Sequence, residues 1–150
     1  IKYVINHLFL YFGHMKKFFT ILIILISVSC DNKECYVDEV YVNKLITLSD
    51  EEFKELQING SYKFIEGGNA GIIIYHMSNN EFKAFDRICS YQSCDECSFI
   101  DSINSGIAFC NCCTSAFLLD QNGNAINKPA IAPLKQYYCL TNGQILRIYN

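Results

Sequence analysis

The stretch from Cys89 to Cys113 constrains this chain more than any other part of its sequence. It holds six of the nine cysteines. They fall into two short groups, residues 89–97 and 110–113, and the segment between them predicts a turn and a strand. Two loops of this kind either meet around a metal ion or are joined by disulfides. The function of the chain depends on which of the two occurs.

The spacing Cys94-x2-Cys97 and Cys110-x2-Cys113 favours a metal site. A Cys-x2-Cys turn directs two thiolates to one point, and two such turns complete a tetrahedral site suited to zinc or iron. The first pair also has the spacing of a thioredoxin-type redox motif. That motif requires a βαβ setting, and the two acidic residues inside the pair disfavour a reactive thiolate. We therefore favour metal ligation.

The rest of the chain predicts an all-β domain with one short helix. Apolar runs alternate with turn signals such as Asn142-Gly143, which is typical of a small antiparallel sandwich or barrel. Ser49 and Glu52 form a capping box that predicts a helix ending near Ile58. The expected strands are residues 40–48, 62–65, 71–76, 81–85, 116–119, 136–140 and 144–149.

The N-terminal residues 1–29 predict a signal segment, with Met15 as the expected true start. Its apolar run is too short for a spanning helix, and the sequence before Cys30 resembles a bacterial lipobox, in which the cysteine is lipidated. We expect residues 30–39 to be a lipid-anchored tether and residues 40–150 to form the folded domain. An uncleaved membrane anchor is the alternative. Both place the protein in the cell envelope, at the outer membrane or facing the periplasm.

Charge and residue types exclude several function classes. All 15 acidic residues lie after position 30, where only nine Lys and Arg accompany them. A nucleic-acid partner is therefore not expected, because it requires a basic face. No Ser/His/Asp set, phosphate-binding loop or carboxylate pair is found, so we expect an electron carrier at most, not an enzyme. His76 is the only histidine beyond the N-terminal segment, and we expect it to be an ordinary strand residue.

From about residue 62 to 148 the sequence resembles the Rieske [2Fe-2S] domain. Rieske proteins carry C-x-H and C-x-x-H boxes on two loops of a small β-sandwich, and respiratory members extend them to C-T-H-L-G-C and C-P-C-H-G-S. Residues 89–94, CSYQSC, align with the first box, and residues 110–115, CNCCTS, align with the second. The chain is similar to histidine-poor Rieske-like domains of predicted Bacteroidetes lipoproteins. The flanking matches are Ala84-Phe85-Asp86-Arg87, Phe117, Gly123, Pro129-Ala130, Pro133-Leu134 and Tyr138.

The sequence departs from the family at both histidine positions, where it has Tyr91 and Cys113. A Rieske centre needs two imidazoles on one iron, so this chain cannot form one. The resemblance implies Cys89 and Cys110 as ligands and a thiolate from Cys113. Cys97 would take the place of Tyr91, which we expect to pack within its loop. These four cysteines are expected to hold an all-thiolate [2Fe-2S] cluster or a zinc ion.

The resemblance also implies a disulfide between the loops, Cys94–Cys112, which leaves Cys35 and Cys139 as a pair. The expected function is an exported lipoprotein that transfers electrons, held at a membrane by its lipid and working with a redox protein. The alternative follows from export, because cysteines in an oxidising compartment more often form disulfides. The domain would then bind no metal and would serve as a disulfide-stabilised structural or binding module of the envelope.

Overall fold

A computed structural model of the chain describes residues 35–78 and 80–150. The predicted signal segment, its start at Met15 and the lipidated Cys30 lie outside the described residues, and the tether is described only from Cys35 onward. Within the described part of the chain, no helix has the length and apolar character needed to span a membrane.

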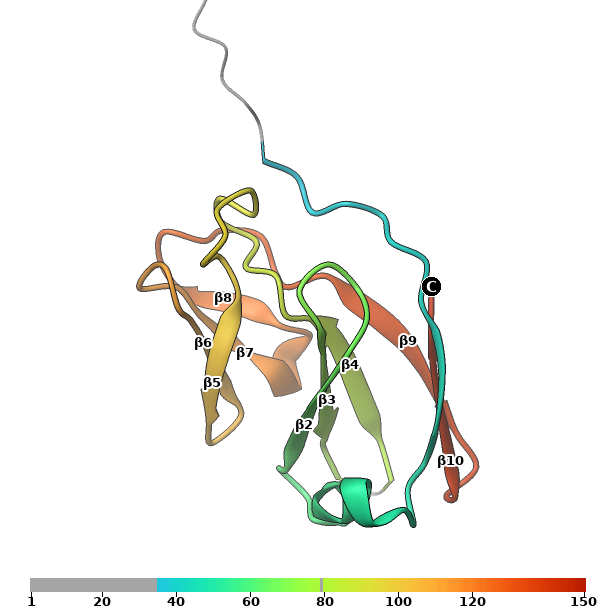
Figure 1. The fold of residues 1–150 in the computed structure, drawn as a ribbon. Helices are drawn as coiled ribbons and strands as arrows, with labels where there is room; N and C mark the ends of the chain where they lie inside the picture. Colours follow the sequence, from blue (N-terminus) through green and yellow to red (C-terminus); the bar gives the residue numbers. More distant parts are fainter. Residues whose placement is uncertain (1–34, 79) are drawn as a thin grey trace, which may run out of the picture. The chain divides into compact units, whose positions relative to one another are not determined.

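Two antiparallel sheets build the domain, as Figure 1 shows. The six-stranded sheet has the order β1-β10-β9-β4-β3-β2 and curls into a half-barrel, and the four-stranded sheet has the order β5-β6-β7-β8. The predicted all-β class is therefore confirmed. The strands are β1 (Asn43–Thr47), β2 (Tyr62–Ile65), β3 (Ile72–His76), β4 (Phe82–Asp86), β5 (Ile100–Asn104), β6 (Ile107–Cys110), β7 (Ala116–Leu118), β8 (Asn124–Asn127), β9 (Gln136–Thr141) and β10 (Ile145–Tyr149).

The apolar strand β3 separates two hydrophobic clusters, and all five of its residues are buried. Side chains alternate between the faces of a strand, so Ile73 and Tyr75 join one cluster whereas Ile72 and Ile74 join the other. The first cluster includes Phe85 and Phe117 and also contains two of the cysteines. An uninterrupted apolar run of this kind is typical of a strand that is covered on both faces.

Arg87 connects the two sheets just beyond the end of β4. Its Nε and Nη2 atoms donate hydrogen bonds to the carbonyl of Ile100 in β5, at 3.1 and 2.9 Å. Its guanidinium also lies 4.2 Å from the ring centroid of Phe64 in β2, which is a cation–π geometry. This contact fixes the start of the cysteine-bearing sheet against the half-barrel.

The predicted helix is a 3₁₀ helix, η1 (Glu51–Gln57), and the predicted capping box is wrong. Asp50 occupies the N-cap position, and no side chain caps the helix. The reason is local, because the backbone N–H of Asp50 bonds to the carbonyl of Thr47 in a tight turn directly after β1. A short second 3₁₀ helix, η2 (Leu119–Gln121), follows β7.

Sequence patterns located most strands to within a few residues but failed in two places. The predicted single strand between the cysteine groups is the hairpin of β5 and β6. Strand β8 was not predicted, because three of its four residues are exposed and its sequence is NAIN. Its strand conformation comes from pairing with β7, and not from an apolar pattern.

Candidate metal centre

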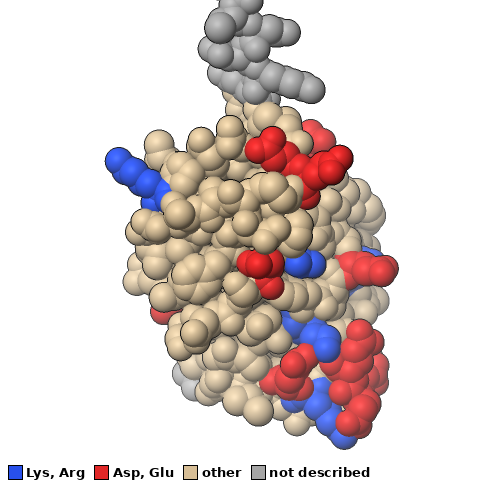
Figure 2. Space-filling view, turned by 60° about the vertical axis from the view of Figure 1, so that its left-hand side comes forward, with Lys and Arg blue, Asp and Glu red and all other residues tan. Residues whose placement is uncertain are grey.

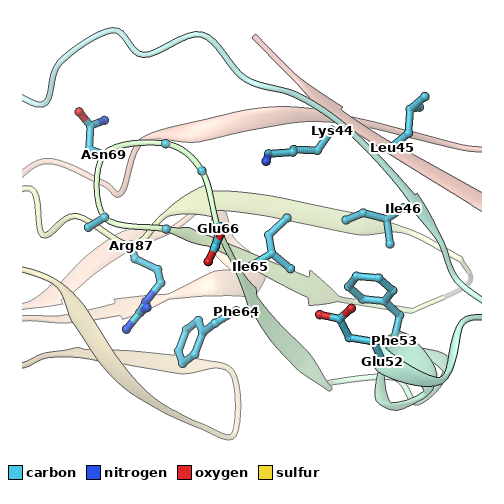
Figure 3. Close-up of a pocket in the computed structure, with 14 residues that line it drawn as sticks. Lys44, Leu45, Ile46, Glu52, Phe53, Phe64, Ile65, Glu66, Asn69 and Arg87 are labelled. Atoms are coloured by element: carbon cyan, nitrogen blue, oxygen red, sulfur yellow. The ribbon is translucent and has the colours of Figure 1, made fainter.

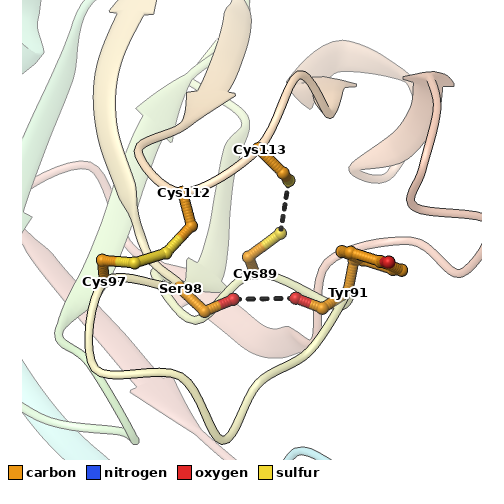
Figure 4. The surroundings of a disulfide bond; sticks show 6 residues. All are labelled: Cys89, Tyr91, Cys97, Ser98, Cys112 and Cys113. Carbon is orange, nitrogen blue, oxygen red and sulfur yellow. Dashed lines mark hydrogen bonds between the residues drawn. A yellow bond between two sulfur atoms is a disulfide. The ribbon is translucent and has the colours of Figure 1, made fainter.

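Three cysteines, Cys89, Cys110 and Cys113, bring their sulfur atoms to one point. Their Sγ atoms all lie within 4.8 Å of one another. The Sγ atoms of Cys89 and Cys113 are 3.9 Å apart, as the dashed line in Figure 4 shows. Thiolates that share one tetrahedral ion, each at about 2.3 Å, lie roughly 3.5–4 Å apart. The Cys89–Cys113 pair has this spacing, and the third sulfur atom lies close enough for all three thiols to converge on one metal centre.

The backbone around these thiols is held by hydrogen bonds within each loop and between the two loops. The N–H of Cys89 donates to the carbonyl of Ser98, at 2.9 Å. The N–H of Asn111 donates to the carbonyl of Phe99, also at 2.9 Å, and this bond connects the second loop to the first. Cys110 ends strand β6 and its N–H bonds to Ser115. Backbone hydrogen bonds of the sheet and the loops therefore hold the cysteine positions.

The site is buried on one side and open on the other. Cys89 is 0% exposed and Cys110 is 7% exposed, and both belong to the first hydrophobic cluster. Cys113 is half-buried and packs against the edge of that cluster. A metal held here would be shielded from water by the protein core and would meet solvent on the Cys113 side.

Burial controls the protonation of the thiols. It raises the pKa of Cys89 to about 12 and also raises the pKa of Cys110. Burial acts in the same direction on Cys113, but hydrogen bonds with Ser115 and with the thiols of Cys110 and Cys89 together outweigh it, so the pKa of Cys113 lies below its usual value. Ser115 lies 3.1 Å from the Cys113 sulfur and accepts a hydrogen bond from the N–H of Ala130. A cation would compensate the charge of thiolates that burial otherwise disfavours.

Two disulfides hold the loops, and their pairing differs from the prediction. Cys97 bonds to Cys112 across the two loops (Figure 4), with Cα atoms 5.3 Å apart. Cys35 bonds to Cys94, with Cα atoms 5.4 Å apart. Both separations lie in the range that a disulfide requires. The predicted pairs Cys94–Cys112 and Cys35–Cys139 are therefore wrong.

Cys139 has no disulfide partner among the described residues. It lies in β9 opposite Ile148 of β10 and packs against the second hydrophobic cluster. This cluster is not the one that contains the metal-site cysteines, so Cys139 belongs to a different part of the core.

Cys97 was predicted as the fourth ligand, and its disulfide to Cys112 makes it unavailable. Cys97 therefore does not take the place of Tyr91 at the first histidine position of the family. The Tyr91 side chain packs against the first hydrophobic cluster, and its carbonyl accepts a hydrogen bond from the Ser98 hydroxyl at 2.7 Å (Figure 4). The described residues thus offer three converging thiols and no fourth one.

Asp86 anchors the start of the first loop and was not singled out as a site residue from the sequence. It is fully buried and accepts hydrogen bonds from the backbone N–H groups of Asn69, Ala70 and Ile88, at 2.7, 3.2 and 2.9 Å. The Asn69 side-chain amide and the Tyr137 hydroxyl also donate to it, at 2.8 and 2.7 Å. Asp86 therefore fixes Ile88, the residue before Cys89, against β9 and the glycine-rich turn of residues 66–71 between β2 and β3.

A hollow of about 780 Å³ lies apart from the cysteines, along β1, η1, β2 and the glycine-rich turn. Figure 3 shows Lys44 extending from β1 toward the glycine-rich turn, and Ile46, Ile65 and Glu66 also line the hollow. Acidic and basic side chains alternate near η1, where Lys54 pairs with Glu51. Figure 2 shows charges of both signs side by side and no continuous basic surface on the face that it presents.

The fold and the site together define a small all-β domain that presents a cysteine cluster on two disulfide-linked loops. The model of the family described as the Rieske [2Fe-2S] domain matches residues 47–138, and the chain belongs to this family. The resemblance that the sequence indicated is thereby confirmed. No curated protein sequence matches the chain.

Solved structures share the fold at low sequence identity. The chain is similar to the ferredoxin of carbazole 1,9a-dioxygenase from Nocardioides aromaticivorans IC177, with 15% identity and a TM-score of 0.50, over 73% of this chain and 97% of that chain. It is also similar to a chain in a complex of reduced oxygenase and oxidized ferredoxin in carbazole 1,9a-dioxygenase, with 14% identity and a TM-score of 0.50, over 75% and 94%. These similarities concern the fold alone.

The donor set does not fit the histidine ligation of a Rieske centre. His76 lies in β3 and is not among the three clustered residues. The set does fit a thiolate-ligated centre, because three thiols converge at a distance suited to one.

Proposed function

We propose that this chain binds an iron–sulfur centre through Cys89, Cys110 and Cys113 and acts as an electron-transfer domain. The convergence of the three sulfur atoms within 4.8 Å carries this proposal. Membership of the Rieske [2Fe-2S] family supports iron as the metal. When bound, such a centre supplies one-electron transfer, and the three thiolates would hold it between the two loops.

The ligand set implies a lower potential than that of a Rieske centre. A thiolate donates more charge than a neutral imidazole and so stabilises the oxidised centre. Rieske centres lie between about −150 and +300 mV, and we expect this chain below about −150 mV on the same scale. Burial of Cys89 and Cys110 keeps water away from the inner side, whereas the half-buried Cys113 marks the side where electrons would enter and leave.

A redox protein is the expected partner, and the loop after β8 supports a contact beside the centre. Ile131 in this loop is 89% exposed. The loop is held against the first cysteine loop, because the Ser90 hydroxyl donates to the carbonyl of Ala132 at 2.7 Å. An exposed apolar side chain next to a redox centre suits a transient protein contact.

Export to the cell envelope, with a lipid on Cys30, is part of the proposal. Two disulfides support an oxidising compartment, since disulfides are rare in the cytosol. The apolar segment before Cys30 supports the lipid anchor. Fractionation of cells into outer membrane, inner membrane and periplasm, with C30A as the control variant, tests this part.

The metal is tested on the full chain purified without oxygen. Iron, zinc and acid-labile sulfide are measured, and an electron paramagnetic resonance spectrum is recorded after reduction. We expect iron and sulfide in the wild type, their loss in C89S, C110S and C113S, and their retention in C139S. Zinc without iron would make the site structural, and electron transfer would then be rejected.

The competing function is a metal-free module that the disulfides stabilise. Its support is that the disulfide Cys97–Cys112 already joins the two loops. In that case, the purified protein contains neither metal, and Cys89, Cys110 and Cys113 show the same thiol reactivity before and after treatment with a chelator.

A further inference from the structure

His76 is a buried histidine without hydrogen-bond partners. It ends strand β3, is 5% exposed, and neither Nδ1 nor Nε2 finds a partner among the described residues. Leaving a buried polar group unsatisfied costs about 1–3 kcal/mol. Buried polar atoms in native proteins are usually paired with protein, water or a ligand. The two ring nitrogens therefore indicate that a further group binds beside His76.

Ser61 lies next to His76 and has the same property. The N–H of His76 donates to the Ser61 carbonyl at 3.0 Å, and the N–H of Gly60 donates to the His76 carbonyl at 2.7 Å. Gly60 has a φ of +80°, so the three residues form a glycine-type β-bulge that continues the register of β2 and β3. Residues opposite each other in a pair share a face. The Ser61 hydroxyl is also buried and unpaired.

The neighbours of His76 on β3 and β4 explain why its ring nitrogens have no hydrogen-bond partner among the described residues. The ring alternates with Ile72 and Ile74 on one face of β3 and stacks on Phe82, with centroids 4.4 Å apart and an interplanar angle of 12°. Leu56 packs in the same cluster as Phe82. These neighbours are apolar and offer no donor or acceptor. A partner for the imidazole therefore has to come from the cavity that His76 lines.

A cavity of about 220 Å³ opens beside His76. Besides His76, polar side chains in its lining come from Ser49, Gln57, Asn80 and Gln144, and the described lining contains no Lys, Arg, Asp or Glu. The cavity is large enough for a small organic molecule, because one water occupies about 30 Å³ of the liquid. It lies at the η1 end of the half-barrel, whereas the cysteine loops follow the opposite end of β4 (Figure 1).

The lining selects the chemical class of the ligand. Lys and Arg are the usual partners of an anion and carboxylates those of a hard divalent cation, and the described lining contains neither. A neutral imidazole offers one donor and one acceptor, and the amide and hydroxyl side chains offer both. We propose that this cavity is a second binding site, independent of the cysteines, for a small uncharged molecule whose polar group both donates and accepts hydrogen bonds, as a carboxamide does.

The test uses the full chain labelled with ¹⁵N-histidine. Acetamide and propionamide are titrated as probes, with acetate as the anionic arm and Zn²⁺ as the cationic arm. The carboxamides should shift the ring resonances of His76 saturably, and the other two probes should leave them unshifted. The absence of a saturable shift would show that only water occupies the cavity, and a shift by acetate or Zn²⁺ alone would show that the ligand class is wrong. Either result would overturn the proposal.

Variants separate binding from folding. H76F keeps an aromatic ring on Phe82 but removes both nitrogens, so we expect at least tenfold weaker carboxamide binding with an unchanged or higher Tm. Q144A, which shortens a polar side chain of the lining, should weaken binding two- to fivefold, whereas S102A, at an exposed position on β5, should not change it. Binding is followed for all variants by backbone amide shifts around the cavity. Equal affinity in H76F and the wild type would refute a role for His76.

Discussion

The carboxylate of Asp86 offers the clearest prediction of stability. It is fully buried and accepts five hydrogen bonds from four residues: Asn69, Ala70, Ile88 and Tyr137. These residues lie on the glycine-rich turn, the first cysteine loop and β9. Replacing Asp86 by alanine therefore removes the common acceptor of three segments that are far apart in the sequence.

The expected cost of D86A follows from where the donors lie. Asn69, Ala70 and Ile88 are half-buried and regain water when the loops shift, whereas the Tyr137 hydroxyl is buried and loses its partner. Removing one member of a buried charged network costs about 3–5 kcal/mol. For a domain of this size, that loss lowers Tm by about 12–20 °C. D86N keeps the shape of the side chain but places its amide N–H₂ group against hydrogen-bond donors. We therefore expect a loss of stability between zero and that of D86A.

The assay is denaturant and thermal unfolding, followed by circular dichroism with the disulfides intact. Y137F is the matched control, because it removes one hydrogen bond and leaves the carboxylate its other donors, at a cost of about 1–2 kcal/mol. The reasoning is refuted if D86A is no less stable than Y137F. It is also refuted if D86N equals the wild type, since the negative charge would then contribute nothing.

Three further predictions concern the same framework. Replacing both cysteines of a disulfide by serine should destabilise the domain by about 4 kcal/mol for Cys35–Cys94 and about 3 kcal/mol for Cys97–Cys112, because the first closes the longer loop, 59 residues against 15. The reverse order in urea unfolding would contradict this entropic account. G68A should destabilise the domain by about 1–3 kcal/mol, because Gly68 has a φ of +60° and an added Cβ would lie 2.6 Å from both Asp86 Oδ2 and Tyr137 Oη. G60A is its control, because Gly60 also has a positive φ but an added Cβ would meet no atom within 4 Å. Equal losses of stability in G68A and G60A would mean that only the backbone conformation matters and that the contact with Asp86 and Tyr137 does not. Burial raises the pKa of Cys139 from 9.0 to about 12, so the folded state favours the protonated thiol, and the stability it contributes below pH 9 should fall as the pH rises from 9 to 12. The stability of C139V, measured by unfolding, should decline less over that pH range. In metal-free protein at pH 8, mass spectrometry should find Cys113 alkylated well before Cys139.

The sequence was sufficient to exclude a Rieske centre, because that conclusion depends only on residue identity. Tyr91 and Cys113 occupy the histidine positions, and a centre with two imidazoles cannot be built from His76 alone. The apolar run of β3 and the turn at Asn142-Gly143 were equally readable, since local patterns and turn residues determine them.

Other elements were decided by their neighbours in space. β8 has an exposed polar sequence and is a strand because β7 pairs with it. The segment after Ser49 forms a 3₁₀ helix because the turn from Thr47 to Asp50 replaces the capping box. The local sequence pattern does not show that β8 pairs with β7 or that Asp50 bonds to Thr47.

The cysteines show the same division. The sequence determined which residues are thiols, and family resemblance indicated Cys89, Cys110 and Cys113, whose sulfur atoms do converge. The tertiary structure decided that Cys97 pairs with Cys112 and Cys94 with Cys35. A disulfide forms only where two Cα atoms approach to about 4.4–6.8 Å, and that distance is set by how the loops pack and not by spacing along the chain.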